Sequence, residues 1–167
     1  DFEYDTNADN FTFHKCNICK HIYLNPRPTE NTLHLIYPQN YGNYSNSQKF
    51  SLAFTIKSLI ESIFIKKLIN IGNLPKSILD VGCGDGRLLQ IIRKIVGKNC
   101  SLEGIEISTK ASKNAKQAGF KVYDESIEKI NLTTKSYDYI FMIQVIEHLH
   151  QPIESIKKIY NALNNGG

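Results

Sequence analysis

Residues 78–92, ILDVGCGDGRLLQII, run from an apolar segment into a turn with three glycines and then into an amphipathic stretch. This order is typical of a buried strand, a tight turn and a helix. Glycines let the backbone adopt positive φ and approach a ligand closely. The helix that follows points its free N–H groups and positive dipole end at the same place. We therefore predict a ligand site at the carboxyl end of this strand.

The spacing of the glycines separates classes of ligand. A dinucleotide turn reads G-x-G-x-x-G, whereas here the glycines are Gly82, Gly84 and Gly86, and Arg87 takes the place of the third dinucleotide glycine. A phosphate-binding loop ending in Gly-Lys-Ser/Thr is also absent from the sequence. The turn fits a ligand with a ribose and a small carboxylate but no pyrophosphate. A nicotinamide-dependent oxidoreductase stays as an alternative, which Arg87 disfavours.

Apolar runs and amphipathic stretches alternate through the rest of the chain. This alternation predicts an α/β fold: a Rossmann-like, doubly wound parallel sheet with helices on both faces, preceded by a small loop-rich extension. We expect the extension at 1–47 and the larger domain at 48–167. The expected strands are 77–81, 101–107, 120–123 and 137–143, and the expected helices are 86–96, 109–118 and 152–163, with a short helix at 29–36.

A further helix is expected at 48–71. Its large apolar residues share one broad face, which we expect to pack on the sheet, with a membrane-surface helix as the alternative. These residues are Leu52, Ile56, Leu59, Ile60, Ile63 and Phe64. Charged residues interrupt the stretch, so we expect no membrane span.

The net charge of +4 over 167 residues is modest. It would help with an anionic partner without demanding nucleic acid, and we expect no nucleic-acid partner. Lys110, Lys113 and Lys116 recur at helical spacing, which is typical of a solvated helix face. Four cysteines, only two of them in a CxxC, do not form a secreted disulfide framework, and a cytoplasmic location is expected.

A second candidate anchor lies one strand along the chain. Glu106 ends the next expected strand, about twenty residues after the turn, where an acidic side chain accepts hydrogen bonds from both ribose hydroxyls. Such a carboxylate would repel a 2′-phosphate. Four segments resemble, in order and spacing, motifs of the class I S-adenosylmethionine-dependent methyltransferases. They are LDVGCGDGRLL, LEGIEIS, SYDYIFMIQVIEHLHQP and the terminal LNNGG. The resemblance covers roughly residues 76–167.

The resemblance implies S-adenosyl-L-methionine as cofactor and a small-molecule acceptor, such as a metabolite or a glycan or lipid precursor. It implies that Asp80 and the turn Gly82, Cys83, Gly84 and Gly86 surround the methionine part, and that Glu106, with Ile107 beside it, holds the ribose. It places Ser126 and Ile127 at the adenine, Gln144 and Val145 on the methionine side, and Glu147 and His148 near the acceptor. His148 is the candidate general base, with a structural histidine as the alternative. Cys83 is interpreted as a packing residue of the turn, because no paired base is evident.

The extension carries a second resemblance. HKCNICKHIYLNPRPTENTLHLIYPQNYGNY is similar to the segment that precedes the methyltransferase domain in many bacterial members, where a CxxC such as Cys16 and Cys19 is half of a zinc knuckle. His14 and His21 could complete four ligands, while two reduced thiols in a loop are the alternative. We expect the sequence to be part of a longer chain, whose missing strands would leave a sheet edge that favours a homodimer. A non-catalytic cofactor-binding module is the third hypothesis.

Overall fold

The computed structural model describes residues 12–27, 52–69 and 73–167. The chain divides into two compact units, Asp1–Asn43 and Tyr44–Gly167, which are described separately. In the first unit, strands β1 (Phe13–Lys15) and β2 (Ile22–Leu24) form an antiparallel pair. The turn between them contains the CxxC, and the Cys16 N–H closes it on the His21 carbonyl at 2.8 Å. The short helix expected at 29–36 lies outside the described residues.

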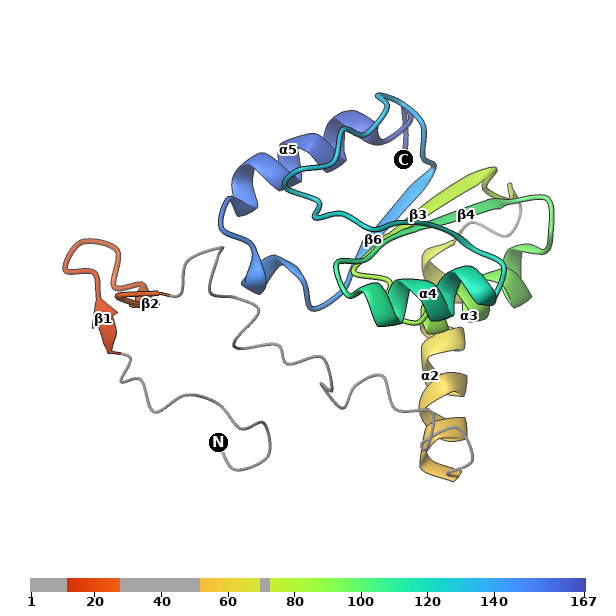
Figure 1. Ribbon diagram of the computed structural model, residues 1–167, viewed down its shortest axis with the longest axis horizontal. Helices are drawn as coiled ribbons and strands as arrows, with labels where there is room; N and C mark the ends of the chain where they lie inside the picture. Colours follow the sequence, from red (N-terminus) through yellow and green to blue (C-terminus); the bar gives the residue numbers. More distant parts are fainter. Residues whose placement is uncertain (1–11, 28–51, 70–72) are drawn as a thin grey trace. The chain divides into compact units, whose positions relative to one another are not determined.

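The second unit is built on a four-stranded parallel sheet (Figure 1). Its strands are β3 (Ser77–Val81), β4 (Ser101–Ile105), β5 (Lys121–Tyr123) and β6 (Tyr139–Met142), in the spatial order β5-β4-β3-β6. Because β4 lies on one side of β3 and β6 on the other, the winding of the sheet reverses at β3. Ligands of open α/β sheets bind at this point, beyond the carboxyl ends of the strands.

Helices cover both faces of the sheet, so the predicted fold class is confirmed (Figure 1). The first core contains Ile78 of β3 with side chains of α2 (Leu52–Leu68), α3 (Arg87–Val96) and α4 (Thr109–Gln117). The second contains the next residue, Leu79, with side chains of α5 (Pro152–Ala162) and of the segment after β5. Adjacent residues of β3 thus enter opposite cores, as the side-chain period of a strand requires.

The predicted orientation of α2 is wrong. The apolar side chains expected to pack on the sheet are half exposed or more: Ile56 50%, Leu59 61%, Ile60 62%, Ile63 49% and Phe64 57%. The helix contacts the core through Ile65 and Ile69 instead. The side chain of Leu52 lies outside what the structure describes.

The physical reason is that α2 is apolar around most of its circumference, so hydrophobic spacing does not select one face. A bidentate ion pair supplies the missing information. The guanidinium of Arg87 at the start of α3 donates to both carboxylate oxygens of Glu61, and its Nη2 lies 2.9 Å from Oε1. This contact holds the side of α2 that carries Glu61 and Ile65 toward the first core, which Ile69, directly after the helix, also enters.

The other predicted elements are confirmed, with shifts at their ends. The strands expected at 101–107 and 137–143 are shorter, and Tyr137 makes only an isolated parallel bridge to Leu163. Lys110, Lys113 and Lys116 are exposed on α4, as expected. Within the residues that the structure describes, no helix has both the length and the apolar content to cross a membrane.

Candidate functional site

The glycine turn joins β3 to α3 at the edge where the parallel strands end. Gly82, Gly84 and Gly86 have φ of 75°, 56° and 81°, which side chains rarely adopt. The N–H groups of Gly82 and Cys83 both donate to the Ile105 carbonyl at the end of β4, at 2.8 and 3.1 Å. The turn is therefore fixed against the neighbouring strand.

The first and third glycines serve different purposes. A Cβ at Gly82, which is exposed, would lie 2.5 Å from Cγ2 of Val145, so the turn lies directly against the segment after β6. A Cβ at Gly86, which is buried, would lie 3.1 Å from Phe120 and 3.2 Å from Ala115. Gly82 thus allows Val145 to lie directly against the turn, while Gly86 allows α3 to pack closely.

The structure brings Glu106 to the glycine turn. Its Oε2 accepts the Gly84 N–H at 2.9 Å, and its Oε1 accepts the Ser108 N–H at 2.7 Å. The side chain is only 4% exposed, so the carboxylate is held by backbone groups rather than by solvent. Each oxygen keeps a further lone pair for a ligand hydroxyl.

Asp80, at 3% exposure, is a second buried carboxyl at this edge. Burial raises its pKa to about 7, and the negative charge of Glu106 adds to the rise, while Arg87 opposes it. A carboxyl of this kind gains or loses its proton near neutrality and responds to a cation placed beside it.

Cys83 packs inside the turn, as interpreted from the sequence. It is buried, and a Cβ on Gly104 of β4 would meet its Sγ at 2.4 Å. Burial, with Asp80 next in importance, raises the pKa of the Cys83 thiol to about 12. The thiolate that a nucleophile requires is therefore disfavoured.

The residues expected at the adenine follow β5 at the same edge. The Glu106 N–H donates to the Tyr123 carbonyl at 3.0 Å, so the end of β5 lies beside the Glu106 segment. Ser126 begins a turn in which its Oγ accepts the Glu128 N–H at 3.1 Å. Ile127 is buried in the second core, whereas Ile107 is 70% exposed.

The residues expected near the methionine and the acceptor follow β6. Gln144 is exposed and has a φ of 55°, and Val145 lies against Gly82. The short 3-10 helix η4 (Ile146–His148) then carries Glu147 and His148, whose carboxylate Oε1 and imidazole Nε2 are 3.9 Å apart. The His148 side chain is exposed, as a base that faces an acceptor must be.

The CxxC belongs to the first unit. Hydrogen bonding from the Cys19 and Ile18 backbone lowers the pKa of the Cys16 thiol. Both flanking imidazoles stack on one ring: His14 and His21 have centroids 6.0 and 6.4 Å from that of Tyr23. Among residues 12–27, 52–69 and 73–167, no three His, Cys, Asp or Glu side chains gather as metal ligands would. The zinc knuckle stays a prediction for a longer chain.

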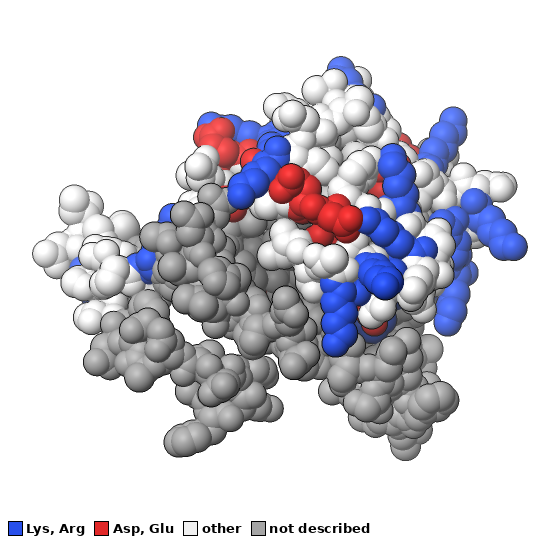
Figure 2. All heavy atoms as spheres, in the orientation of Figure 1, with Lys and Arg blue, Asp and Glu red and all other residues white. Residues whose placement is uncertain are grey.

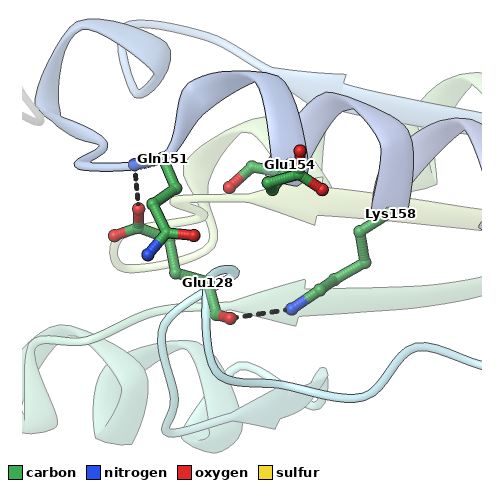
Figure 3. A pocket seen from close by; sticks show the side chains of 5 residues that line it. Glu128, Gln151, Glu154 and Lys158 are labelled. Carbon is green, nitrogen blue, oxygen red and sulfur yellow. Dashed lines mark hydrogen bonds between the residues drawn. The ribbon is translucent and has the colours of Figure 1, made fainter.

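Sequence reasoning missed the residues that connect α5 to the turn after β5. A small cavity of about 30 Å³ lies there, lined by Glu128, Gln151, Glu154, Ser155 and Lys158 (Figure 3). It has room for about two waters and not for a nucleoside. Lys158 binds the backbone of this turn about thirty positions earlier in the chain, and no local sequence pattern indicates such a contact.

A family model described as a methyltransferase domain matches residues 57–167, which contain the whole sheet and every predicted cofactor-binding residue. The chain belongs to this methyltransferase domain family. A ubiquinone biosynthesis O-methyltransferase from Nitrosomonas europaea is 30% identical over 62% of this chain and 46% of its own length. The mitochondrial ubiquinone biosynthesis O-methyltransferase of Saccharomyces cerevisiae is 24% identical over 96% of this chain and 53% of its own length. The chain thus spans about half the length of these relatives.

Solved methyltransferase structures share the fold. The plantazolicin methyltransferase BpumL, solved with a monoazolic desmethylPZN analog and SAH, matches 80% of this chain and 52% of its own, with 26% identity and a TM-score of 0.62. A second BpumL structure, with a pentazolic analog and SAH, matches 72% of this chain and 47% of its own, with 27% identity and a TM-score of 0.57.

One relative of this methyltransferase domain corrects the exclusion of nucleic acid. A tRNA U34 carboxymethyltransferase from Nautilia profundicola is 31% identical over 66% of this chain and 38% of its own length. The exclusion rested on a modest net charge, and charge alone does not decide the acceptor. On the face in Figure 2, basic side chains are numerous and a group of acidic side chains lies among them.

Proposed function

We propose that the chain binds S-adenosylmethionine at the carboxyl edge of the sheet and serves in methyl transfer to a small-molecule acceptor. The contact between Glu106 and Gly84 carries this proposal. It joins a ribose-binding carboxylate to a turn whose glycine spacing does not suit a pyrophosphate. Relatives named as O-methyltransferases and neighbours solved with SAH support it.

The surroundings of three residues, Gly82, Asp80 and Ile107, suit the cofactor. Gly82 is exposed and has no side chain, so a ligand can approach the backbone of the turn closely there. Asp80, with its raised pKa, would hold negative charge next to a cationic sulfonium or amino group. Ile107, which is exposed, offers an apolar surface beside Glu106.

When bound, the cofactor supplies an electrophilic methyl carbon. The chain then has to bind, orient and exclude water. Glu106, already fixed by two backbone N–H groups, would hold the ribose without rearranging, which lowers the ordering cost of binding. His148 would take a proton from an acceptor hydroxyl, if the acceptor carries one.

The acceptor class rests on the relatives. Two of them are named for ubiquinone biosynthesis and O-methyl transfer, which favours an oxygen atom of a small-molecule acceptor. We propose this acceptor class for the whole protein, because the chain spans only about half the length of these relatives.

Substitution of Glu106 tests the site. Glu106→Ala leaves the Gly84 and Ser108 N–H groups without their partner and removes the ribose acceptor. We expect it to weaken SAH binding by roughly 1–3 kcal/mol in calorimetry. Glu154→Ala is the matched control, since that exposed carboxylate pairs with Lys157 on α5 at 2.8 Å. Equal affinity of Glu106→Ala and the unmodified chain would contradict the assignment.

A further inference from the structure

The side chain of Lys158 holds the turn that follows β5. Its Nζ donates to the carbonyls of Ile127, Glu128 and Ile130 at 2.8, 2.9 and 2.8 Å. An ammonium group has three N–H donors, so all of them are used within one turn. Figure 3 shows the side chain reaching from α5 to the backbone at Glu128.

A second contact of opposite polarity ties the same two elements. Glu128 Oε1 accepts the Gln151 N–H at the start of α5, at 2.6 Å (Figure 3). Glu128 Oε2 also lies 4.0 Å from Nδ1 of His150. The turn and α5 are therefore connected twice, through the Lys158 ammonium group and through the Glu128 carboxylate. We call these contacts, made by Lys158 and Glu128, the α5 clamp.

The clamped turn lies at the proposed cofactor edge. Its first residues, Ser126 and Ile127, follow β5, and the end of β5 bonds to Glu106 through the Tyr123 carbonyl at 3.0 Å. The turn itself is closed by the N–H groups of Lys129 and Ile130 on the Ser126 carbonyl. These three contacts are partly buried, and a carbonyl that loses its donor in such a place is costly.

We propose that Lys158 is a positioning residue for the adenine side of the cofactor site. It acts through the Ser126–Ile127 backbone and does not touch the ligand. This inference rests on the proposed function. It adds that a residue of α5 fixes the backbone of the turn expected to face the adenine. A lysine suits the task because one compact ammonium group serves three carbonyls from different directions.

The test separates the adenine from the rest of the ligand. Titrate Lys158→Met with SAH and with S-ribosylhomocysteine, which keeps the ribose and amino acid but lacks the base. We expect a loss of roughly tenfold for SAH, which is about 1.4 kcal/mol, and less than about twofold for the base-free ligand. Lys157→Met is the matched control, because Lys157 is exposed and pairs only at the surface with Glu154 at 2.8 Å. It should change neither affinity by more than about twofold.

Each other result bears on the inference. Equal losses for both ligands would show a general structural effect and overturn the positioning role, as would an unchanged SAH affinity. If the unmodified chain bound neither ligand, the proposed function itself would fail, which is a distinct outcome. If Lys158→Met does not fold, Glu128→Ala removes the Gln151 contact and keeps the lysine. It should show the same selective loss at smaller size, and no selectivity would again contradict the inference.

Discussion

At the scale of single residues, the raised pKa of Asp80 predicts how the stability of the fold depends on pH. Its folded pKa of about 7 lies above the usual value of a carboxyl, about 4 in an unfolded chain. Between these two values the folded state binds more protons than the unfolded state. The free energy of unfolding therefore falls as the pH rises from about 4 to about 7, and this contribution is constant above that range.

Asp80→Asn removes the titrating group. We expect the fall in stability across that window, at most about 1.4 kcal/mol per pH unit for one proton, to be reduced in the variant. Urea denaturation at a series of pH values measures it. Parallel stability profiles of the variant and the unmodified chain would show that Asp80 does not titrate near neutrality.

The same residue predicts a pH dependence of cofactor binding. The ammonium group of SAH favours ionised Asp80, so SAH affinity should increase as the pH rises through about 7. In Asp80→Asn this increase should disappear, because the amide stays neutral at every pH. Calorimetric titrations at about one pH unit below and above that value measure the difference. An increase of equal size in both proteins would assign it to another group.

At the scale of elements, α2 carries the main disagreement between pattern and structure. Two isoleucines of this helix, Ile60 and Ile65, differ in burial. Ile65 is 1% exposed in the first core, whereas Ile60 is 62% exposed. Ile65→Ala should lower the free energy of unfolding by about 2–4 kcal/mol, and Ile60→Ala by less than about 0.5 kcal/mol. The reverse order would restore the orientation that the sequence predicted.

The difference between α2 and the strands shows which elements could be predicted. The bounds of β3 could be predicted because a short apolar run that ends at a glycine turn is typical of a buried strand. α2 was predicted as a helix, but its face depends on the contact between Glu61 and Arg87, which no local spacing encodes. Lys158 was missed for the same reason, since its partners lie about thirty residues earlier. Glu106 and Gly84 were predictable because parallel strands bring their carboxyl ends to one edge by geometry.

At the scale of the whole molecule, the second unit brings four predicted segments to one edge of a four-stranded sheet. These are Asp80 with the glycine turn, Glu106, Ser126 with Ile127, and the segment of Gln144 and Val145 that leads to His148. Among the described strands, β6 is the outer neighbour of β3, and the expected homodimer through this edge stays a prediction that light scattering would test. All of these residues belong to the second unit, whereas the CxxC belongs to the first.

Calorimetric titration of the chain with SAH and, separately, with NADH decides between a methyl-donor site and a dinucleotide site. The contact of Glu106 with a glycine turn unsuited to pyrophosphate predicts saturable binding of SAH at one site and no heat of binding with NADH. Saturable binding of NADH without binding of SAH would contradict the account.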